Sequence, residues 1–489
     1  MLEIKAVNLK RVKVDTLVVP VCEDGDIHTD KVLASLVDAA RGFPEFKGKK
    51  GDVITLFQPA ETRVARAVFF GLGKAGTLTG ESFRAFAGNA VKFCINAGLS
   101  AMTLATPSAT ALAINAETLF GSLMEGACLG NHIFDRYKME KEKTPVKKVT
   151  FMATAAQKKA YSSLAKSVAA VCGASLKARE WVTTPSNDKR PEAFAEMIQD
   201  AARTAGLKTR IMDDRWLEKQ QFGAMLAVGQ GSSAKPRLVA MEYSPKAAKK
   251  TIVLVGKGVT FDSGGINLKP SGSIETMKMD MSGAAAVAGT MLAVAHLKPD
   301  VKVVGVMPVV ENMPSGTAIR PGDIIRSYAG KTIEIGNTDA EGRLILVDAM
   351  AWAVKQYQPD TMIDLATLTG ACVVALGEKI AGVFSKDQQL VDAIVAAGER
   401  THERCWQLPL PEDYKELLKN DFADLSNVSS GRWGGAITAA LFLSEFVGDT
   451  RWAHIDIAGP AWAKKASDYC EAGGTGFGVR LLCDVIGKI

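Results

Sequence analysis

Four continuous apolar runs in the second half of the chain constrain its fold most strongly. They are residues 251–258 (TIVLVGKG), 302–310 (KVVGVMPVV), 361–370 (TMIDLATLTG) and 452–459 (WAHIDIAG). Runs that are apolar at successive positions are typical of central parallel strands, which helices cover on both faces. Helical patterns at 282–297 and 340–357 separate these runs. The order predicts a doubly wound α/β sheet, mostly parallel, with its sites beyond the carboxyl ends of the strands.

The length of 489 residues exceeds one ordinary core and favours two domains. Apolar, β-branched runs at 16–21, 66–73 and 148–154 alternate with helical patterns, which predicts a smaller N-terminal α/β domain over residues 1–160. A helical pattern without proline continues from Ala155 to Val182, and its residues 161–182 are interpreted as the connecting helix. A second, larger domain is then expected at 183–489.

Composition places the chain among soluble globular proteins, because 47% of it is hydrophobic and 23% is charged. The first residues are charged and alternating, as in a strand rather than a signal peptide. The apolar segment 282–297 is too short and too rich in alanine and glycine to cross a membrane, so we expect a buried helix. Eight cysteines without a CxxC pair indicate buried free thiols in a reducing compartment, and hence a cytoplasmic protein.

The net charge of +6 is unevenly distributed. Residues 1–170 hold 23 lysines and arginines against 16 aspartates and glutamates. Part of this excess is the run KMEKEKTPVKK at 138–148. A solvated loop explains the run, and a surface for nucleic acid or an acidic partner remains an alternative.

Charged residues cluster where the predicted strands end. Alone, each has an ordinary interpretation: Asp280 before a helix is typical of an N-cap, and Lys257 at a strand end is typical of a surface ammonium. Together they form a group of acids and bases at the loops of one sheet, with glycines beside them that allow close backbone approach. The group comprises Lys257, Asp262, Lys269, Asp280, Asp339, Glu341 and Arg343, and Glu311 also lies at a strand end.

Four converging carboxylates would be costly to bury without compensating positive charge. Two divalent cations would balance them, with the metals about 3.5–4 Å apart as in other two-metal sites. Zinc usually takes histidine or cysteine ligands, whereas an oxygen-rich set also suits manganese or magnesium. The five histidines form no paired metal-binding motif and are interpreted as structural.

Five motifs follow one another along this region: GKGVTFDSGGINLKP, MKMDMSGAAAV, NTDAEGRLIL, TLTGA and WAHIDIAG. Together they resemble the motifs of the leucyl aminopeptidase (cytosol aminopeptidase) family. The similarity covers nearly all of residues 180–489, and its most specific part is NTDAEGRLIL at 337–346. The N-terminal third carries little motif of its own.

The resemblance implies a role for each charged residue. Asp262 and Glu341 would bridge two divalent metals, Mn²⁺ or Zn²⁺ with Mg²⁺ as a further candidate. Asp339 would complete one metal, and Lys257 and Asp280 the other. Lys269 would stay charged and face the substrate carbonyl, and Arg343 would hold a bicarbonate ion that relays protons. The implied reaction is attack by a hydroxide held between the metals, which releases the N-terminal residue of a peptide.

The same resemblance implies a substrate pocket, an assembly and a preference. The pocket would favour Leu and other apolar N-terminal residues, and its residues would be Met277, Thr367, Leu368, Gly370, Ala458 and Ala461. Core filling is the alternative for Met277. The chain would form a homohexamer that acts on peptides, with residues 183–489 as the catalytic metallopeptidase domain and the N-terminal domain serving oligomer formation or regulation. DNA binding is a further role in some bacterial relatives, which the basic N-terminal part permits here.

A phosphoryl-transfer enzyme is the competing hypothesis, because two-metal carboxylate sites also serve phosphatases. Lys269 and Arg343 would suit a phosphate as well as a peptide. Two partial motifs for nucleotide binding are rejected: AGKT at 329–332 lacks the first glycine of a P-loop, and VFFGLGK at 68–74 lacks the rest of a dinucleotide fingerprint.

Overall fold

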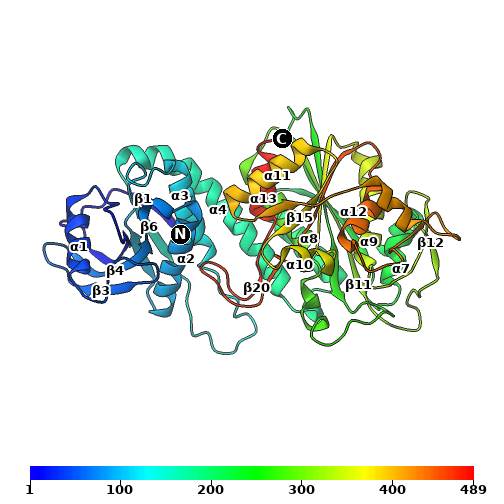
Figure 1. Cartoon of the computed structure of the whole chain (residues 1–489), viewed down its shortest axis with the longest axis horizontal. Helices are drawn as coiled ribbons and strands as arrows, with labels where there is room; N and C mark the ends of the chain where they lie inside the picture. Colours follow the sequence, from blue (N-terminus) through cyan, green and yellow to red (C-terminus); the bar gives the residue numbers. More distant parts are fainter. The chain divides into compact units, whose positions relative to one another are not determined.

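The structure, a computed structural model, describes residues 1–489 and divides into two compact units. The first unit comprises Met1–Gly173 and Lys465–Ala472, and the second comprises Ala174–Lys464 and Gly473–Ile489. Figure 1 shows both units along one chain.

The first unit is built on a six-stranded sheet with the order β1-β6-β5-β2-β4-β3. All neighbouring strands pair in parallel except β3, which runs antiparallel to β4 at one edge. Its elements are β1 (Leu2–Lys5), β2 (Val14–Cys22), α1 (Lys31–Arg41), β3 (Val53–Phe57), β4 (Val64–Gly73), α2 (Gly80–Asn96), β5 (Ala101–Leu104), α3 (Ala116–Leu129), β6 (Lys148–Met152) and the first part of α4 (Ala155–Thr183).

The second unit is built on a nine-stranded sheet with the order β16-β15-β18-β14-β9-β11-β8-β7, and β10 pairs with β11 beyond this path. The central strands β18, β14, β9 and β11 are parallel, as is the pair β10 and β11. Antiparallel pairs occur between β15 and β18 and among β11, β8 and β7. The predicted α/β class and mostly parallel central sheet are thus confirmed.

The strands of the large sheet are β7 (Lys208–Met212), β8 (Arg237–Tyr243), β9 (Thr251–Gly256), β10 (Gly258–Asp262), β11 (Lys302–Asn312), β14 (Thr361–Ala366), β15 (Ala381–Phe384), β16 (Cys405–Gln407) and β18 (Arg451–Asp456). The helices around it are α5 (Pro191–Thr204), α6 (Asp214–Lys219), α7 (Gly223–Gly229), α8 (Ser282–Leu297), α9 (Glu341–Tyr357), α10 (Gly370–Leu376), α11 (Gln388–Thr401), α12 (Gly435–Ser444) and α13 (Val479–Ile486). Short strands pair outside it, in the set β12 (Ile324–Arg326), β13 (Thr332–Glu334) and β17 (Leu425–Ser426) and in the pair β19 (Trp462–Ala463) and β20 (Gly473–Gly474).

Helices cover both faces of the large sheet, which explains why its central strands are apolar throughout. Val253 and Val255 of β9 pack in one core cluster with residues of α7, α9 and α12. Ile252 and Leu254 alternate with them and are also buried. In Figure 1, α9 and α12 lie on one side of the sheet and α8, α11 and α13 on the other.

The predicted buried helix at 282–297 is α8, with the same bounds. A 3-10 turn, η3 (Ile274–Met279), precedes it, so the helical segment Ile274–Leu297 has 24 residues. By length and composition alone it is the one helix that could cross a membrane, but 78% of its apolar window is buried inside the protein. Its contacts with β9, β11 and β14 are those of a core helix.

The compact units differ from the predicted domain limits in two respects. Their division falls at Gly173, within α4, and residues 465–472 join the first unit although they were expected in the catalytic domain. Side chains of α2 hold this segment: Lys92 pairs with Glu471 at 2.7 Å, and Asn89 donates to Asp468 at 2.9 Å. These partners are nearly 380 residues apart in sequence, so local patterns cannot reveal them.

Candidate metal centre

The charged residues of the predicted site meet at the carboxyl ends of the central strands. Lys257 follows β9, Asp262 is the last residue of β10, and Asp280 lies between η3 and α8. Asp339 and Glu341 stand at the start of α9. The parallel strand order brings these loops to one edge of the sheet, as expected for a doubly wound fold.

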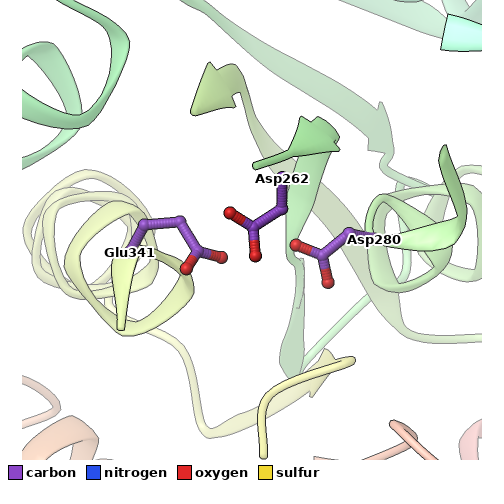
Figure 2. Close-up of side chains that lie close together, drawn as sticks. All are labelled: Asp262, Asp280 and Glu341. Atoms are coloured by element: carbon purple, nitrogen blue, oxygen red, sulfur yellow. The ribbon is translucent and has the colours of Figure 1, made fainter. Parts of the chain in front are cut away.

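Three carboxylates form the centre of this group. Oxygens of Asp262, Asp280 and Glu341 all lie within 4.8 Å of one another, and all three residues are buried. Figure 2 shows the three carboxylates pointing toward one another from a strand end and from the starts of two helical segments. Such oxygen donors at this spacing are the arrangement that divalent cations bind.

Two lysines lie among the acids. The Nζ atom of Lys257 lies 2.8 Å from Asp280 and 2.9 Å from Glu341, and it donates to the carbonyl of Thr367 at 2.8 Å. Lys269 lies 2.9 Å from Asp262 and 2.5 Å from Asp339. Lys257 is therefore a buried ammonium at a strand end and not a surface one.

Gly342 leaves space for the side chain of Lys257. A Cβ atom added at Gly342, in the first turn of α9, would come 2.5 Å from Cε and 2.8 Å from Nζ of Lys257. A larger residue at 342 would require the side chain of Lys257 to shift. The helix that carries Glu341 thus approaches Lys257 closely because its next residue has no side chain.

The acids of the centre are short of positive charge. Burial raises the pKa of Asp262, Asp280 and Asp339 above the ordinary aspartate value, and the neighbouring carboxylates add to this effect while the lysines oppose it. Burial alone would lower the pKa of Lys257 and Lys269, but the surrounding carboxylates raise it. Oδ2 of Asp280 is buried and accepts no hydrogen bond. Divalent cations fit this donor set, because they would supply both the missing charge and the missing partner.

Arg343 follows Glu341 by two residues in the first turn of α9. It is buried, and its Nη1 donates to the carbonyl of Asn427 at 2.7 Å. Burial lowers its pKa to about 10, against the opposing effect of Glu341 and Asp456. Its Nε atom has no hydrogen-bond partner, so the guanidinium retains donor capacity for an anion.

The predicted pocket residues lie on three segments around the centre. Thr367 donates to Oδ1 of Asp280 at 2.7 Å, Leu368 follows it, and Gly370 begins α10. Ala458 and Ala461 follow β18. Met277 lies half-buried in η3, close in sequence to Asp280.

Comparison with known protein families shows which family the chain belongs to. The sequence model of the cytosol aminopeptidase family's catalytic domain matches residues 176–483, and that of the family's N-terminal domain matches residues 21–141. The chain belongs to the cytosol aminopeptidase family. Members of this family are aminopeptidases, which are hydrolases, and the family depends on metal ions.

Curated relatives match over nearly their whole length. A "Probable cytosol aminopeptidase" from Geobacter sp. (strain M21) is 44% identical over 445 residues, which cover 90% of this chain and 89% of the relative. Another from Chlorobium limicola is 39% identical, with 100% of this chain and 99% of the relative covered.

A solved structure is similar over the whole fold. The "Bottromycin maturation enzyme BotP in complex with Mn" superimposes with a TM-score of 0.86 at 35% sequence identity, and the match covers 97% of this chain and 99% of that chain. That structure is a complex with manganese of a protein that has the same fold.

Sequence reasoning missed Asn312, the last residue of β11. Its Nδ2 atom donates to Oδ1 of Asp262 at 2.9 Å and to the carbonyl of Thr338 at 3.1 Å, so one amide orients a carboxylate and the loop before Asp339. The adjacent Glu311 lies outside the cluster and pairs with Arg190 at 3.2 Å. The period of two along a strand, which sends neighbouring side chains to opposite faces, is the signal that separates the two residues.

The histidines and cysteines behave as expected from their lack of metal-binding motifs. His454 is buried, with Nδ1 2.6 Å from Asp364, and His28 contacts the carbonyl of Pro20 at 2.8 Å. All eight cysteines are free thiols, and seven of them are buried. None of these residues belongs to the carboxylate cluster.

Proposed function

We propose that the chain is an aminopeptidase with two divalent metals, which releases N-terminal residues from peptides and prefers Leu and other apolar residues. The observation that carries the proposal is the cluster of Asp262, Asp280 and Glu341, buried and within 4.8 Å of one another beside two lysines. Membership of an aminopeptidase family gives independent support for the reaction class.

In this proposal Asp262, Glu341 and Asp339 would hold one metal, and Asp262, Glu341, Lys257 and Asp280 would hold the other. Mn²⁺ and Zn²⁺ are the candidates, with Mg²⁺ as a third. When bound, such ions polarise a carbonyl and lower the pKa of water enough to generate a nucleophile near neutral pH. As a ligand Lys257 must be a neutral amine, so its proton has to leave the site when the metal enters.

Lys269 is the cation that this chain presents to the substrate. Its Nζ is held by Asp262 and Asp339, whose charges keep the pKa above the ordinary lysine value, so the ammonium stays protonated at neutral pH. An ammonium fixed in this way can donate to the carbonyl oxygen as negative charge develops on it.

Arg343 is proposed to hold a bicarbonate ion. The buried guanidinium has its Nη1 committed to Asn427 and its Nε unpaired, which leaves donors for one small anion. Held there by Arg343, such an anion would supply a general base beside the carboxylate cluster.

The test is parallel turnover of leucine p-nitroanilide and p-nitrophenyl phosphate after chelation and reloading with Mn²⁺, Zn²⁺ or Mg²⁺. Metal-dependent release from the anilide alone supports the proposal. Turnover of the phosphate alone would overturn it in favour of phosphoryl transfer. The anilides of Ala, Leu and Asp then measure the preference assigned to Met277, Thr367, Leu368, Gly370, Ala458 and Ala461.

We further propose a cytoplasmic homohexamer that acts on peptides, with the N-terminal domain serving oligomer formation or regulation. Light scattering should then give six times the chain mass of 52.0 kDa. DNA binding by the basic N-terminal part is the separate second role that the sequence permits, and a salt-sensitive gel shift would detect it.

A further inference from the structure

A second buried carboxylate, Asp456, lies outside the metal cluster at the end of β18. It is fully buried, and its two oxygens accept three hydrogen bonds. Oδ1 accepts from the backbone N–H of Leu368 and from that of Ala458, each at 3.1 Å. Oδ2 accepts from the hydroxyl of Thr369 at 2.7 Å. Each donor belongs to a loop rather than to the sheet.

Asp456 stands at the point where the pairing of β14 with β18 ends. The parallel ladder of β14 and β18 ends at the pair Ala366 and Asp456, with one further bond from the N–H of Ile457 to the carbonyl of Ala366 at 2.8 Å. Beyond that point the loops after the two strands no longer pair with each other. There the side chain of Asp456 links the two loops, because its Oδ1 accepts a hydrogen bond from the N–H of Leu368 and another from the N–H of Ala458.

Thr369 extends this connection into α10. Its hydroxyl donates to Asp456 and also accepts from the N–H of Cys372 at 3.0 Å, so it caps the helix that Gly370 begins. The first turn of α10 is therefore fixed to the end of β18 through one side chain. On the other side of Leu368, Thr367 donates to the metal-centre residue Asp280.

We propose that Asp456 is a positioning residue for the specificity pocket, which holds the loops 367–370 and 457–461 at a fixed separation. This inference rests on the proposed function, because five of the six proposed pocket residues lie on these two loops. Asp456 is not placed in contact with metal or substrate. It would act by fixing the backbone of the pocket walls, and thus by setting which N-terminal side chains fit.

Two substitutions separate this role from simple loss of stability. Asp456→Ala leaves the N–H groups of Leu368 and Ala458 without their partner, so the loops should loosen. Asp456→Asn keeps an Oδ1 that can accept both bonds, and its amide can donate to the hydroxyl of Thr369. The matched control is Asp364→Asn, because Asp364 is equally buried on β14 but binds Trp452 and His454 instead of the loops.

The experiment measures kcat/KM for leucine and alanine p-nitroanilides with Mn²⁺, together with bound manganese, in all three variants and the unchanged chain. Asp456→Ala should retain its manganese while the preference for leucine over alanine falls about tenfold or more. Asp456→Asn and Asp364→Asn should keep that preference. An unchanged preference in Asp456→Ala, or an equal loss in Asp364→Asn, would overturn the proposal.

Amide hydrogen exchange supplies a readout that does not depend on activity. Asp456→Ala should accelerate exchange in peptides that contain Leu368 and Ala458 but not in those from α9, and Asp456→Asn should restore protection. Uniform acceleration throughout the second unit would contradict a local role. If the unchanged chain cleaved neither anilide, the proposed function would fail, and the exchange data would still decide whether Asp456 orders the two loops.

Discussion

At the scale of single residues, the main feature is a set of charges that no partner inside the protein fully balances. Four acids meet two lysines in one buried region, and burial raises the pKa of three of those acids. Lys257 and Lys269 lie in the same cluster but differ in surroundings, since the side chain of Lys257 is 4% exposed and that of Lys269 is 15% exposed. This difference in exposure is consistent with the two proposed roles, in which Lys257 binds metal and Lys269 faces the substrate.

The first prediction separates these two kinds of residue. Asp339→Ala should lose metal and activity, because it removes a proposed ligand. Lys269→Ala should keep its metal and lose at least about a hundredfold in kcat, since it removes a donor to the developing oxyanion. Metal content by mass spectrometry and anilide turnover check both outcomes. A fully active Asp339→Ala enzyme would refute the assignment of the site.

The second prediction concerns Asn312. Asn312→Ala removes the hydrogen bond that orients Asp262, and manganese affinity should fall about 10–100-fold, as is typical when a partner of a metal ligand is lost. Titration calorimetry with Mn²⁺ measures the change. The control is Asn89→Ala, which removes an amide contact within the first unit. Equal manganese affinity in the two variants would show that Asn312 has no influence on the site.

Sequence reasoning predicted the charged residues because their spacing and chemistry are visible without coordinates. It did not predict Asn312 or Asp456. Asn312 is a neutral amide next to the charged Glu311, so charge alone favours the wrong residue. Only the strand register shows which of the two faces the cluster. Asp456 lies within the motif WAHIDIAG, but its proposed positioning role depends on hydrogen bonds from Leu368 and Thr369, about 88 residues away.

At the scale of secondary structure, helix α9 connects the metal centre to the core. Its first turn carries Glu341 and Arg343, and its next turn carries Asp348, which is fully buried. Asp348 accepts from the N–H of Met225 at 2.9 Å and from that of Tyr328 at 2.7 Å. A single carboxylate thus anchors α9 to α7 and to the loop after β12.

The third prediction follows from the burial of Asp348, which raises its pKa to about 7. The folded state then binds the proton more tightly than the unfolded state, so this group's contribution to stability falls as pH rises from about 4 to about 7. The free energy of unfolding, relative to Asp348→Asn, should decrease by roughly 4 kcal/mol over that range. Urea denaturation of both proteins at several pH values measures it, and a difference independent of pH would contradict the shift.

The fourth prediction tests the close approach of α9 to Lys257. In an ordinary helix, glycine to alanine stabilises by up to about 1 kcal/mol. Gly342→Ala should instead weaken manganese binding and lower the melting temperature, because the new methyl group collides with the lysine. Gly121→Ala, in α3, is the control, since a Cβ there meets nothing within 4 Å. Equal behaviour of the two variants would exclude the steric argument.

Local patterns predicted the long elements well. The helices expected at 155–182, 282–297 and 340–357 occur as α4, α8 and α9 with bounds within one residue, because each has a continuous helical pattern. The short strands β7, β15 and β16 were not predicted, and neither was the order of the sheet. Those features depend on pairings between distant segments, for which single-sequence periodicity holds no information.

At the scale of the whole molecule, the chain consists of two units, and the cytosol aminopeptidase family has a domain model that matches residues in each of them. The larger unit contains all of the proposed catalytic residues. The separation of charge seen in the sequence, with the excess of lysine and arginine in residues 1–170, belongs mainly to the first unit. All residues of the proposed chemistry thus lie in the second unit, and the proposed oligomer formation or regulation is assigned to the first.

The most direct test of the account is the number of metal ions that the folded chain retains. After loading with Mn²⁺ and gel filtration, elemental analysis should find about two ions per chain. Asp262→Asn should reduce this number, whereas Glu311→Gln, the same chemical change at a neighbouring strand end outside the cluster, should not. Retention of no manganese by the unchanged chain, or of the full amount by Asp262→Asn, would contradict the central claim.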